Sequence, residues 1–216
     1  MSIDYGREAA ARRHAARRED ERTIAGEHRP MRRADREVTD HDAIGAIVEA
    51  CDVVDVAYTD AEGLTIVPLN FGHDYDREGG RLVLWFHSAP HGRRLDAIRA
   101  AGNRLPVAFA MRTDCEVTEG RTPCNWGEAF TSIVGEGTAS IVDDLDERRH
   151  GLVRLMAQQA HMPHVEFTDA QVRSVTVWKV EASRLTAKAR PRPTATHARG
   201  ARDIDAQAAG KVARKA

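Results

Sequence analysis

The chain has 216 residues with a formal net charge of −1, and 42% of them are hydrophobic but only 5% aromatic. This length suffices for one domain of ordinary size with extensions, and the core must be built mainly from Val, Ile, Leu and Ala. The charge is uneven: residues 1–36 carry +3, residues 187–216 carry +6, and the body between them carries −10. An acidic body lacks the basic face that phosphate backbones require, so we do not expect a nucleic-acid partner.

Both ends of the chain read as charged tails. Residues 1–30 are rich in Ala, Arg and Glu, which favour a helix, but they offer almost no apolar stripe to bury. Residues 189–216 form a basic tail rich in Ala and Arg. We therefore expect one folded domain at residues 31–188. No run of about 18 apolar residues could span a bilayer, no secretory signal is present, and the three cysteines lack CxxC spacing. These features predict a cytoplasmic protein with reduced thiols and no membrane partner.

The first predicted elements of this domain are a helix and a β-hairpin. Residues 39–51 carry apolar side chains at helical spacing after a capping residue. Two runs rich in β-branched residues, 53–59 and 64–72, flank a short turn and predict the hairpin. Pro68 cannot donate a hydrogen bond to a neighbouring strand, so the second run must be an edge strand or contain a bulge.

The middle of the chain continues with strands and one helix. Residues 73–80 are polar and predict a turn, and residues 81–88 predict a strand. A helix at residues 92–103 follows a proline and a glycine, and it ends at a second glycine. Residues 104–113 and 128–142 predict two further strands, of which the second is long.

The remaining elements decide the fold class. Gly135 and Gly137 interrupt the long strand and predict a bulge or bend. A helix at residues 145–160 and a last strand at residues 172–188 complete the series. About six strands with three helices, without strict βαβ alternation, predict a mainly β protein: a six-stranded antiparallel sheet that curls into a small barrel with flanking helices.

One corner of this fold is unusually rich in polar groups. The stretch LWFHSAPHGRRLDAI, residues 84–98, joins a buried strand to an amphipathic helix. A helix that begins near Gly92 presents free N–H groups and a positive dipole, and Ser88 with Arg93 or Arg94 adds donors that match a phosphate dianion. The alternative is that both arginines only decorate the helix start and pair with acidic neighbours such as Asp96.

Five stretches, in this order, resemble one known family: MRRADREVTD, IVPLNFG, LWFHSAPHGRRLDAI, PCNW and TSIVGEGTASIVDD. They are similar to the pyridoxamine 5′-phosphate oxidase-like split-barrel flavoproteins, in the branch that contains the nitroimidazole-resistance proteins. The resemblance covers residues 31–188. It implies a homodimeric six-stranded split barrel that binds FMN at the subunit interface and acts on a small-molecule substrate.

The same resemblance implies roles for residues of the corner. It places the FMN phosphate at Ser88, Arg93 and Arg94, and leaves open which arginine meets it. It places Phe86 and His87 beside the redox cofactor, where a histidine could act as the catalytic proton donor. The alternative for His87 is a structural histidine that holds the loop.

Further cofactor contacts are implied on two other strands. Asn70 would direct its amide to the flavin, and the backbone near Pro68 and Leu69 would bond the ring nitrogens and carbonyls. Ser132 matches a position that reaches the cofactor in many relatives, although Thr131 replaces an arginine that is common there. Trp126 and Trp178 would either cover the ring or belong to the core or an interface.

Two function classes remain open. The first is an FMN-dependent oxidoreductase that reduces a small organic acceptor such as a nitroaromatic or a quinone. The second is a non-catalytic flavin- or haem-binding protein, with haem or deazaflavin as the alternative cofactor. We expect no metal site, because prolines interrupt both closely spaced histidine pairs.

Overall fold

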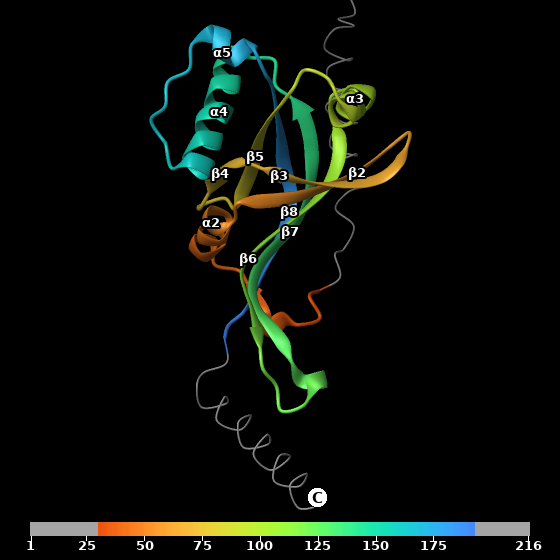
Figure 1. Ribbon diagram of the computed structural model, residues 1–216, viewed down its shortest axis with the longest axis vertical. Coiled ribbons are helices and arrows are strands. Elements are labelled where there is room, and N and C mark those ends of the chain that lie inside the picture. Colours follow the sequence, from red (N-terminus) through yellow and green to blue (C-terminus); the bar gives the residue numbers. More distant parts are fainter. Residues whose placement is uncertain (1–29, 193–216) are drawn as a thin grey trace, which may run out of the picture. The chain divides into compact units, whose positions relative to one another are not determined.

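The computed structural model describes residues 30–192 (Figure 1). Most of both predicted tails therefore lies outside the described residues. Residues up to Asp35 belong to a separate unit, in which the Arg33 guanidinium donates to the Asp35 carboxylate. The unit that begins at Arg36 contains the predicted domain and is the one described below.

The helices and strands follow the chain in this order: η1 (Ala34–Arg36), β1 (Glu37–Val38), α2 (His41–Ala50), β2 (Val53–Asp60), β3 (Gly63–Asn70), β4 (Gly72–Asp76), β5 (Arg81–Ser88), α3 (Arg93–Ala100), β6 (Leu105–Thr118), η2 (Pro123–Asn125), β7 (Gly127–Ile141), α4 (Leu145–Ala160), α5 (Asp169–Arg173) and β8 (Thr176–Arg190). None of the described helices is long and apolar enough to cross a membrane.

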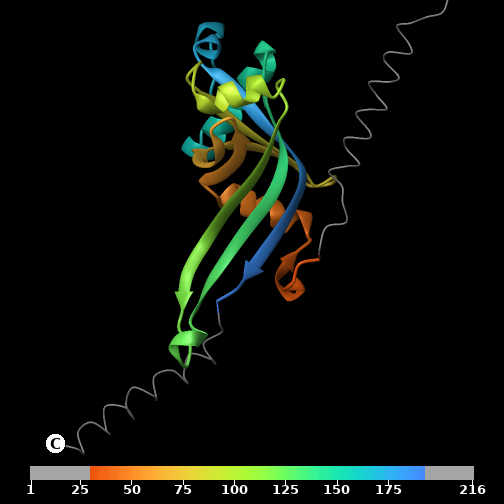
Figure 2. The ribbon, with the colours of Figure 1, turned by 90° about the vertical axis from the view of Figure 1, so that its right-hand side faces the viewer.

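The eight strands of the described region join one antiparallel sheet. Its order is β3-β2-β6-β7-β8-β5-β4, and the short β1 pairs with β8. The long strands β6, β7 and β8 run side by side (Figure 2). This sheet with flanking helices confirms the predicted fold class, a mainly β split barrel, and it adds two strands to the six that the sequence predicts.

One of the added strands corrects a sequence-based prediction. Residues 72–76 form β4, so the polar turn is confined to the residues between Asp76 and Arg81. The segment has no alternating apolar pattern, but it supplies the hydrogen-bonding partner that β5 needs at this edge of the sheet.

Two other predictions about strand geometry are confirmed. Strand β3, which contains Pro68, pairs only with β2 and is the edge strand that proline requires. The register of β7 against β8 shifts between Glu136 and Gly137, which is the predicted bulge. A side chain at Gly137 would collide with the carbonyl oxygen of Glu181, so only glycine allows this close approach.

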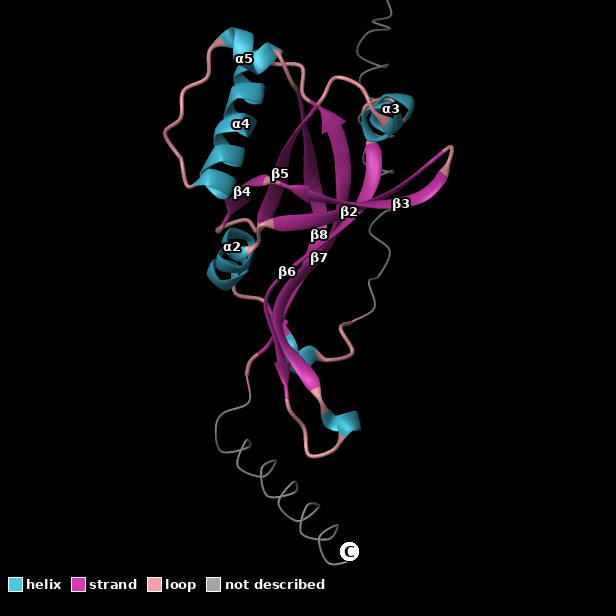
Figure 3. Ribbon diagram, viewed as in Figure 1, coloured by secondary structure: helices cyan, strands magenta, loops and turns pink. Residues whose placement is uncertain are grey.

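Strand β5 carries apolar side chains on both faces, because two separate clusters pack against it. Leu84 and Phe86 belong to the larger cluster, which also takes side chains from α2 and α3. Trp85 belongs to the smaller cluster, which includes Leu152 of α4 and Val172 of α5. Figure 3 shows α4 and α5 together, apart from α3. The last residues of β5 can therefore face two different environments.

Candidate functional site

A cavity of about 250 Å³ that is open to solvent lies at the corner between β5 and α3. Helix α3 begins after Gly92, whose φ of 140° suits glycine, and no side chain caps its first N–H groups. The residues around the cavity come from the β2–β3 hairpin and from the corner itself: Tyr58, Thr65, Val67, Ser88, His91, Gly92, Arg93, Arg94 and Leu95. The corner that the sequence singles out is thus the wall of a real cavity.

Arg94 is the cation of this cavity that no carboxylate neutralises. Its Nη2 donates to Ser88 Oγ at 2.9 Å, and its guanidinium carbon lies 4.7 Å from the centre of the Trp178 ring. Its Nε is buried without a hydrogen-bond partner, and no ion pair involves Arg94 among the described residues. Burial lowers the pKa of Arg94, which reflects the cost of holding an unpaired charge there. An anion in the cavity would offset this cost.

The Trp178 ring that Arg94 contacts is itself held by a second buried aromatic ring. Trp178 is fully buried and stacks on Phe86, with 4.1 Å between ring centres. Its Nε1 donates to Ser88 Oγ at 3.0 Å, so Ser88 accepts from both Trp178 and Arg94. Of the two alternatives for Trp178, the core position is the observed one. The Phe86 side chain also lies in the core and supports the corner from beneath rather than lining its cavity.

Arg93 lies in a different electrostatic environment from Arg94. Its Nε and Nη2 donate to the two carboxylate oxygens of Asp60 at 2.7 and 2.8 Å. This hydrogen bonding holds the pKa of Asp60 below its usual value. Arg93 therefore pairs with an acidic residue, as the second of the two alternatives predicts. The partner is Asp60 and not Asp96, which pairs with Arg99 at 3.0 Å. The structure separates the two arginines that the sequence could not distinguish.

His87 lies on the opposite face of β5 from Ser88. It pairs in register with Val177, which belongs to the smaller cluster, whereas Phe86 pairs with Trp178. His87 does not line the cavity and is exposed, and desolvation by the surrounding protein atoms lowers its pKa. Its catalytic role stays a prediction.

The predicted residues of β3 lie further along the strand that forms one cavity wall. Thr65 and Val67 line the cavity, and Leu69 shares their face of the strand and packs against the core. Pro68 and Asn70 face outward, and Asn70 Nδ2 donates to Gln159 Oε1 at 2.5 Å. Residues 68–70 thus adjoin the cavity wall without lining the cavity, and their cofactor contacts stay a prediction.

Ser132 lies in a second, larger hollow on the outer face of the sheet. This hollow, of about 530 Å³, also contains Val53, Asp55 and Arg112. Ser132 pairs in register with Arg112 and Lys188 and does not line the corner cavity. A role for Ser132 at the cavity would therefore require a second copy of the chain.

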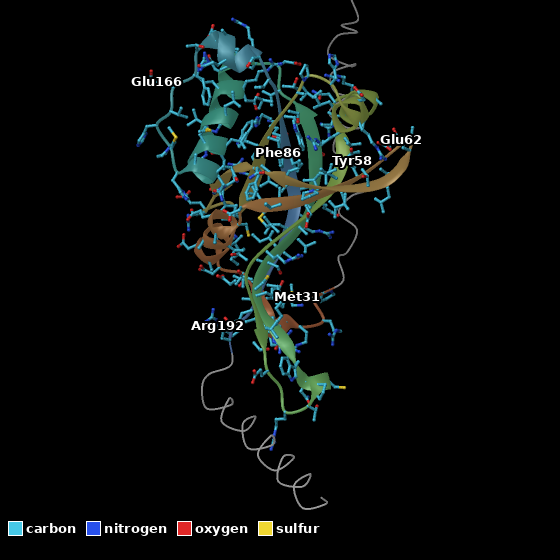
Figure 4. All side chains as sticks on the ribbon, viewed as in Figure 1. Met31, Tyr58, Glu62, Phe86, Glu166 and Arg192 are labelled. Carbon is cyan, nitrogen blue, oxygen red and sulfur yellow. The ribbon has the colours of Figure 1, made fainter. Side chains whose placement is uncertain are left out.

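Sequence reasoning missed the cavity residues that lie outside the corner, which are Tyr58, Thr65 and Val67. They occupy inward positions of the β2–β3 hairpin, whose alternation is visible in the sequence, but nothing local shows that this hairpin reaches α3. Figure 4 labels Tyr58 along the hairpin and Glu62 at its tip. The ion pair between Arg93 and Asp60 links the hairpin to the helix.

This geometry suits an anionic ligand with a phosphate group. Uncapped N–H groups at a helix start, a guanidinium without a carboxylate partner and a hydroxyl converge on one cavity. Charge-assisted hydrogen bonds from such donors are the standard way in which proteins hold phosphate.

Comparison with solved structures shows proteins of the same fold. A candidate 5-nitroimidazole antibiotic resistance protein from Bacteroides thetaiotaomicron is 28% identical, with a TM-score of 0.55, over 70% of this chain and 85% of that chain. A flavocytochrome from Azotobacter vinelandii is 17% identical, with a TM-score of 0.60, over 76% and 73%. The FAD and heme binding protein from Mycobacterium smegmatis is 17% identical, with a TM-score of 0.59, over 73% and 75%.

Comparison with sequence families agrees with the predicted resemblance. No curated protein matches the chain. The model of the family described as pyridoxamine 5′-phosphate oxidase matches residues 40–189, which include every strand of the sheet from β2 onward except the last residue of β8. The chain belongs to the pyridoxamine 5′-phosphate oxidase family.

Proposed function

We propose that this protein is an FMN-dependent oxidoreductase that reduces a small organic acceptor such as a nitroaromatic or a quinone. The observation that carries the proposal is Arg94, a half-buried guanidinium without a carboxylate partner in the described region, which faces a cavity at the start of α3. A half-buried guanidinium without a counter-charge destabilises the folded protein unless an anionic ligand binds beside it.

The residues of the corner fit the phosphate of FMN. Arg94 and the first N–H groups of α3 would donate to the phosphate oxygens, and Ser88 would hold the Arg94 side chain in line. At about 3.3 Å per residue, the three steps from Val67 to Asn70 span roughly 10 Å along β3. The rest of the cofactor can therefore follow β3 from the cavity toward Leu69 and Asn70. When bound, the flavin supplies the electron transfer itself.

The relatives support this choice of chemistry. The family description names an oxidase, and the 28% identical structure is a candidate nitroimidazole resistance protein. A nitroaromatic acceptor is consistent with that neighbour. We also propose a cytoplasmic location, because the exposed Cys115 and Cys124 are free thiols, which fit a reducing compartment.

We further propose that the protein is a homodimer whose subunits meet through the outer face of the sheet. Large apolar side chains are exposed there on three strands: Val53, Leu64, Ile66 and Val134. The strand register places Val53, Leu64 and Ile66 on one face of the hairpin, and Ser132 shares the outer face of β7 with Val134. A second copy seated here could bring its Ser132 to the cofactor of the first.

One absorption spectrum of the purified full-length protein tests the cofactor. Flavin bands that are lost on denaturation, with FMN as the released compound, support the proposal, whereas a Soret band would favour the haem-binding alternative. Reduction of the bound flavin followed by mixing with a nitroaromatic or a quinone then tests turnover. If none of these acceptors reoxidises the reduced flavin, the result favours the alternative of a non-catalytic flavin-binding protein.

Two variants test the remaining parts of the proposal. Ile66→Asp should convert a dimer into a monomer in analytical ultracentrifugation, whereas Glu78→Gln, in the β4–β5 turn, should not. His87→Ala should leave FMN affinity within about twofold of wild type because His87 is absent from the cavity wall. Slower acceptor reduction at unchanged affinity would support a catalytic His87, and unchanged turnover would exclude it.

A further inference from the structure

The ion pair of Arg93 leaves two carboxylates at one edge of the corner cavity. Asp60 occupies two of the guanidinium nitrogens, and Glu62 lies 3.4 Å from a third. The Asp60 side chain is only 11% exposed, whereas that of Arg93 is 39% exposed, so solvent reaches the pair from the arginine side. We call Asp60 and Glu62 the acidic rim. Together they carry one more charge than Arg93 neutralises.

Arg93 and Arg94 cannot serve the same ligand group equally. They are adjacent on α3, and successive residues of an α-helix point about 100° apart. Arg94 turns inward to Ser88 and Trp178, while Arg93 turns to the tip of the β2–β3 hairpin. The cavity therefore has one cationic end at Arg94 and an acidic rim at the hairpin, where Figure 4 shows Glu62.

This polarity distinguishes a terminal phosphate from a diphosphate. A phosphate monoester concentrates roughly −1.5 to −2 charges on one group near pH 7. The diphosphate of a dinucleotide instead carries a single charge on each phosphate, and its second phosphate must continue past the first. At this corner the second phosphate would find Arg93 already bound to Asp60, with Glu62 beside it.

We propose that the acidic rim, Asp60 and Glu62, makes the site selective for FMN over FAD by withholding Arg93 from a second phosphate. This inference rests on the proposed function, since it assumes that the corner binds a flavin phosphate. It assigns a specificity role to two residues outside the cavity wall, and it explains why only one of two adjacent arginines is left without a carboxylate.

The test compares FMN, FAD and riboflavin affinities in the full-length protein by flavin fluorescence titration. Glu62→Gln is the first variant, because Glu62 is 72% exposed and its loss does not threaten folding. Asp60→Asn with Glu62→Gln is the second, and it removes both negative charges that Arg93 contacts. Glu78→Gln is the matched control, since it makes the same change of charge at the opposite end of β5 from Ser88.

The expected result is a change in the ratio of FAD to FMN affinity. Wild type and Glu78→Gln should favour FMN, Glu62→Gln should raise relative FAD affinity about twofold, and the double variant about tenfold. Riboflavin affinity should stay constant throughout. An unchanged ratio in the double variant, or a gain for FMN alone, overturns the inference.

Failure of the proposed function gives a different pattern. If Arg94→Ala leaves FMN affinity unchanged, or if no flavin binds, the corner is not a flavin phosphate site and the inference falls with it. If Arg94→Ala weakens FMN alone while the acidic-rim variants leave the ratio unchanged, the proposed function stands and only the specificity role is rejected.

Discussion

Replacing Arg94 by alanine should weaken FMN binding by a factor that the structure allows us to estimate. Arg94 already contacts Ser88 and Trp178, so its guanidinium is held in position before a ligand arrives. One or two charge-assisted hydrogen bonds to the phosphate, each worth about 1.5–3 kcal/mol, would be lost. Since about 1.4 kcal/mol corresponds to a tenfold change, the Kd for FMN should rise at least about tenfold if one bond forms and at least about 100-fold if both form.

The assay is a titration of the apoprotein with FMN and, separately, with riboflavin. Riboflavin lacks the phosphate, so its affinity should change by less than about twofold, because the lost bonds act on the phosphate alone. Arg94→Lys keeps the charge but loses the planar fork, and it should fall between wild type and alanine. Arg104→Ala is the matched control, since Arg104 is exposed beyond the other end of α3.

Folding must be checked in the same variants. Arg94→Ala also removes the contact with the Trp178 ring, which is worth about 0.5–2 kcal/mol to the folded protein. Thermal unfolding and near-ultraviolet circular dichroism show whether the corner stays ordered at the temperature of the titration. Equal losses for FMN and riboflavin in a folded Arg94→Ala protein would refute the reasoning, because the corner would then not act on the phosphate.

Three further predictions concern the stability of the framework around the site. Ser88→Ala leaves the buried Trp178 Nε1 without an acceptor and should lower the free energy of unfolding by about 1–3 kcal/mol in urea, whereas no loss would mean that Trp178 finds another partner. His73 is 7% exposed and burial lowers its pKa, so the unfolded chain binds more protons than the folded protein as the pH falls through about 6.5. The free energy of unfolding should therefore decrease as the pH falls below about 7, and less steeply in His73→Asn. A pH profile that is identical in wild type and His73→Asn would contradict this assignment. Gly72→Ala would place a methyl group against the backbone of α4 at Leu155 and should cost about 1–3 kcal/mol of unfolding free energy, and a neutral result would show that α4 can shift.

Much of the fold could be predicted from local patterns in the sequence. Helix α4 has the same bounds, Leu145–Ala160, as its predicted apolar repeat. The β2–β3 hairpin, the edge position of Pro68 and the bulge at Gly137 follow from rules that act within a few residues. Strand β4 was missed because its residues are polar and do not alternate, and only its pairing with β5 in the folded sheet makes it a strand.

The candidate site divides in the same way between sequence and structure. The sequence by itself located the strand-to-helix corner with Ser88, two arginines and a helix that starts after Gly92, and it predicted an anion there, because these features lie within seven residues. It could not determine which arginine is free, since Asp60 stands 33 residues before Arg93 and meets it only in the folded sheet. Nor could the sequence tell which face of β5 lines the cavity, because side chains on both faces are apolar. Strand alternation places His87 and Ser88 on opposite faces, but it does not say which of the two faces the cavity. Only tertiary structure decides such questions, because ion pairing and burial depend on distances between segments that the order of residues does not specify.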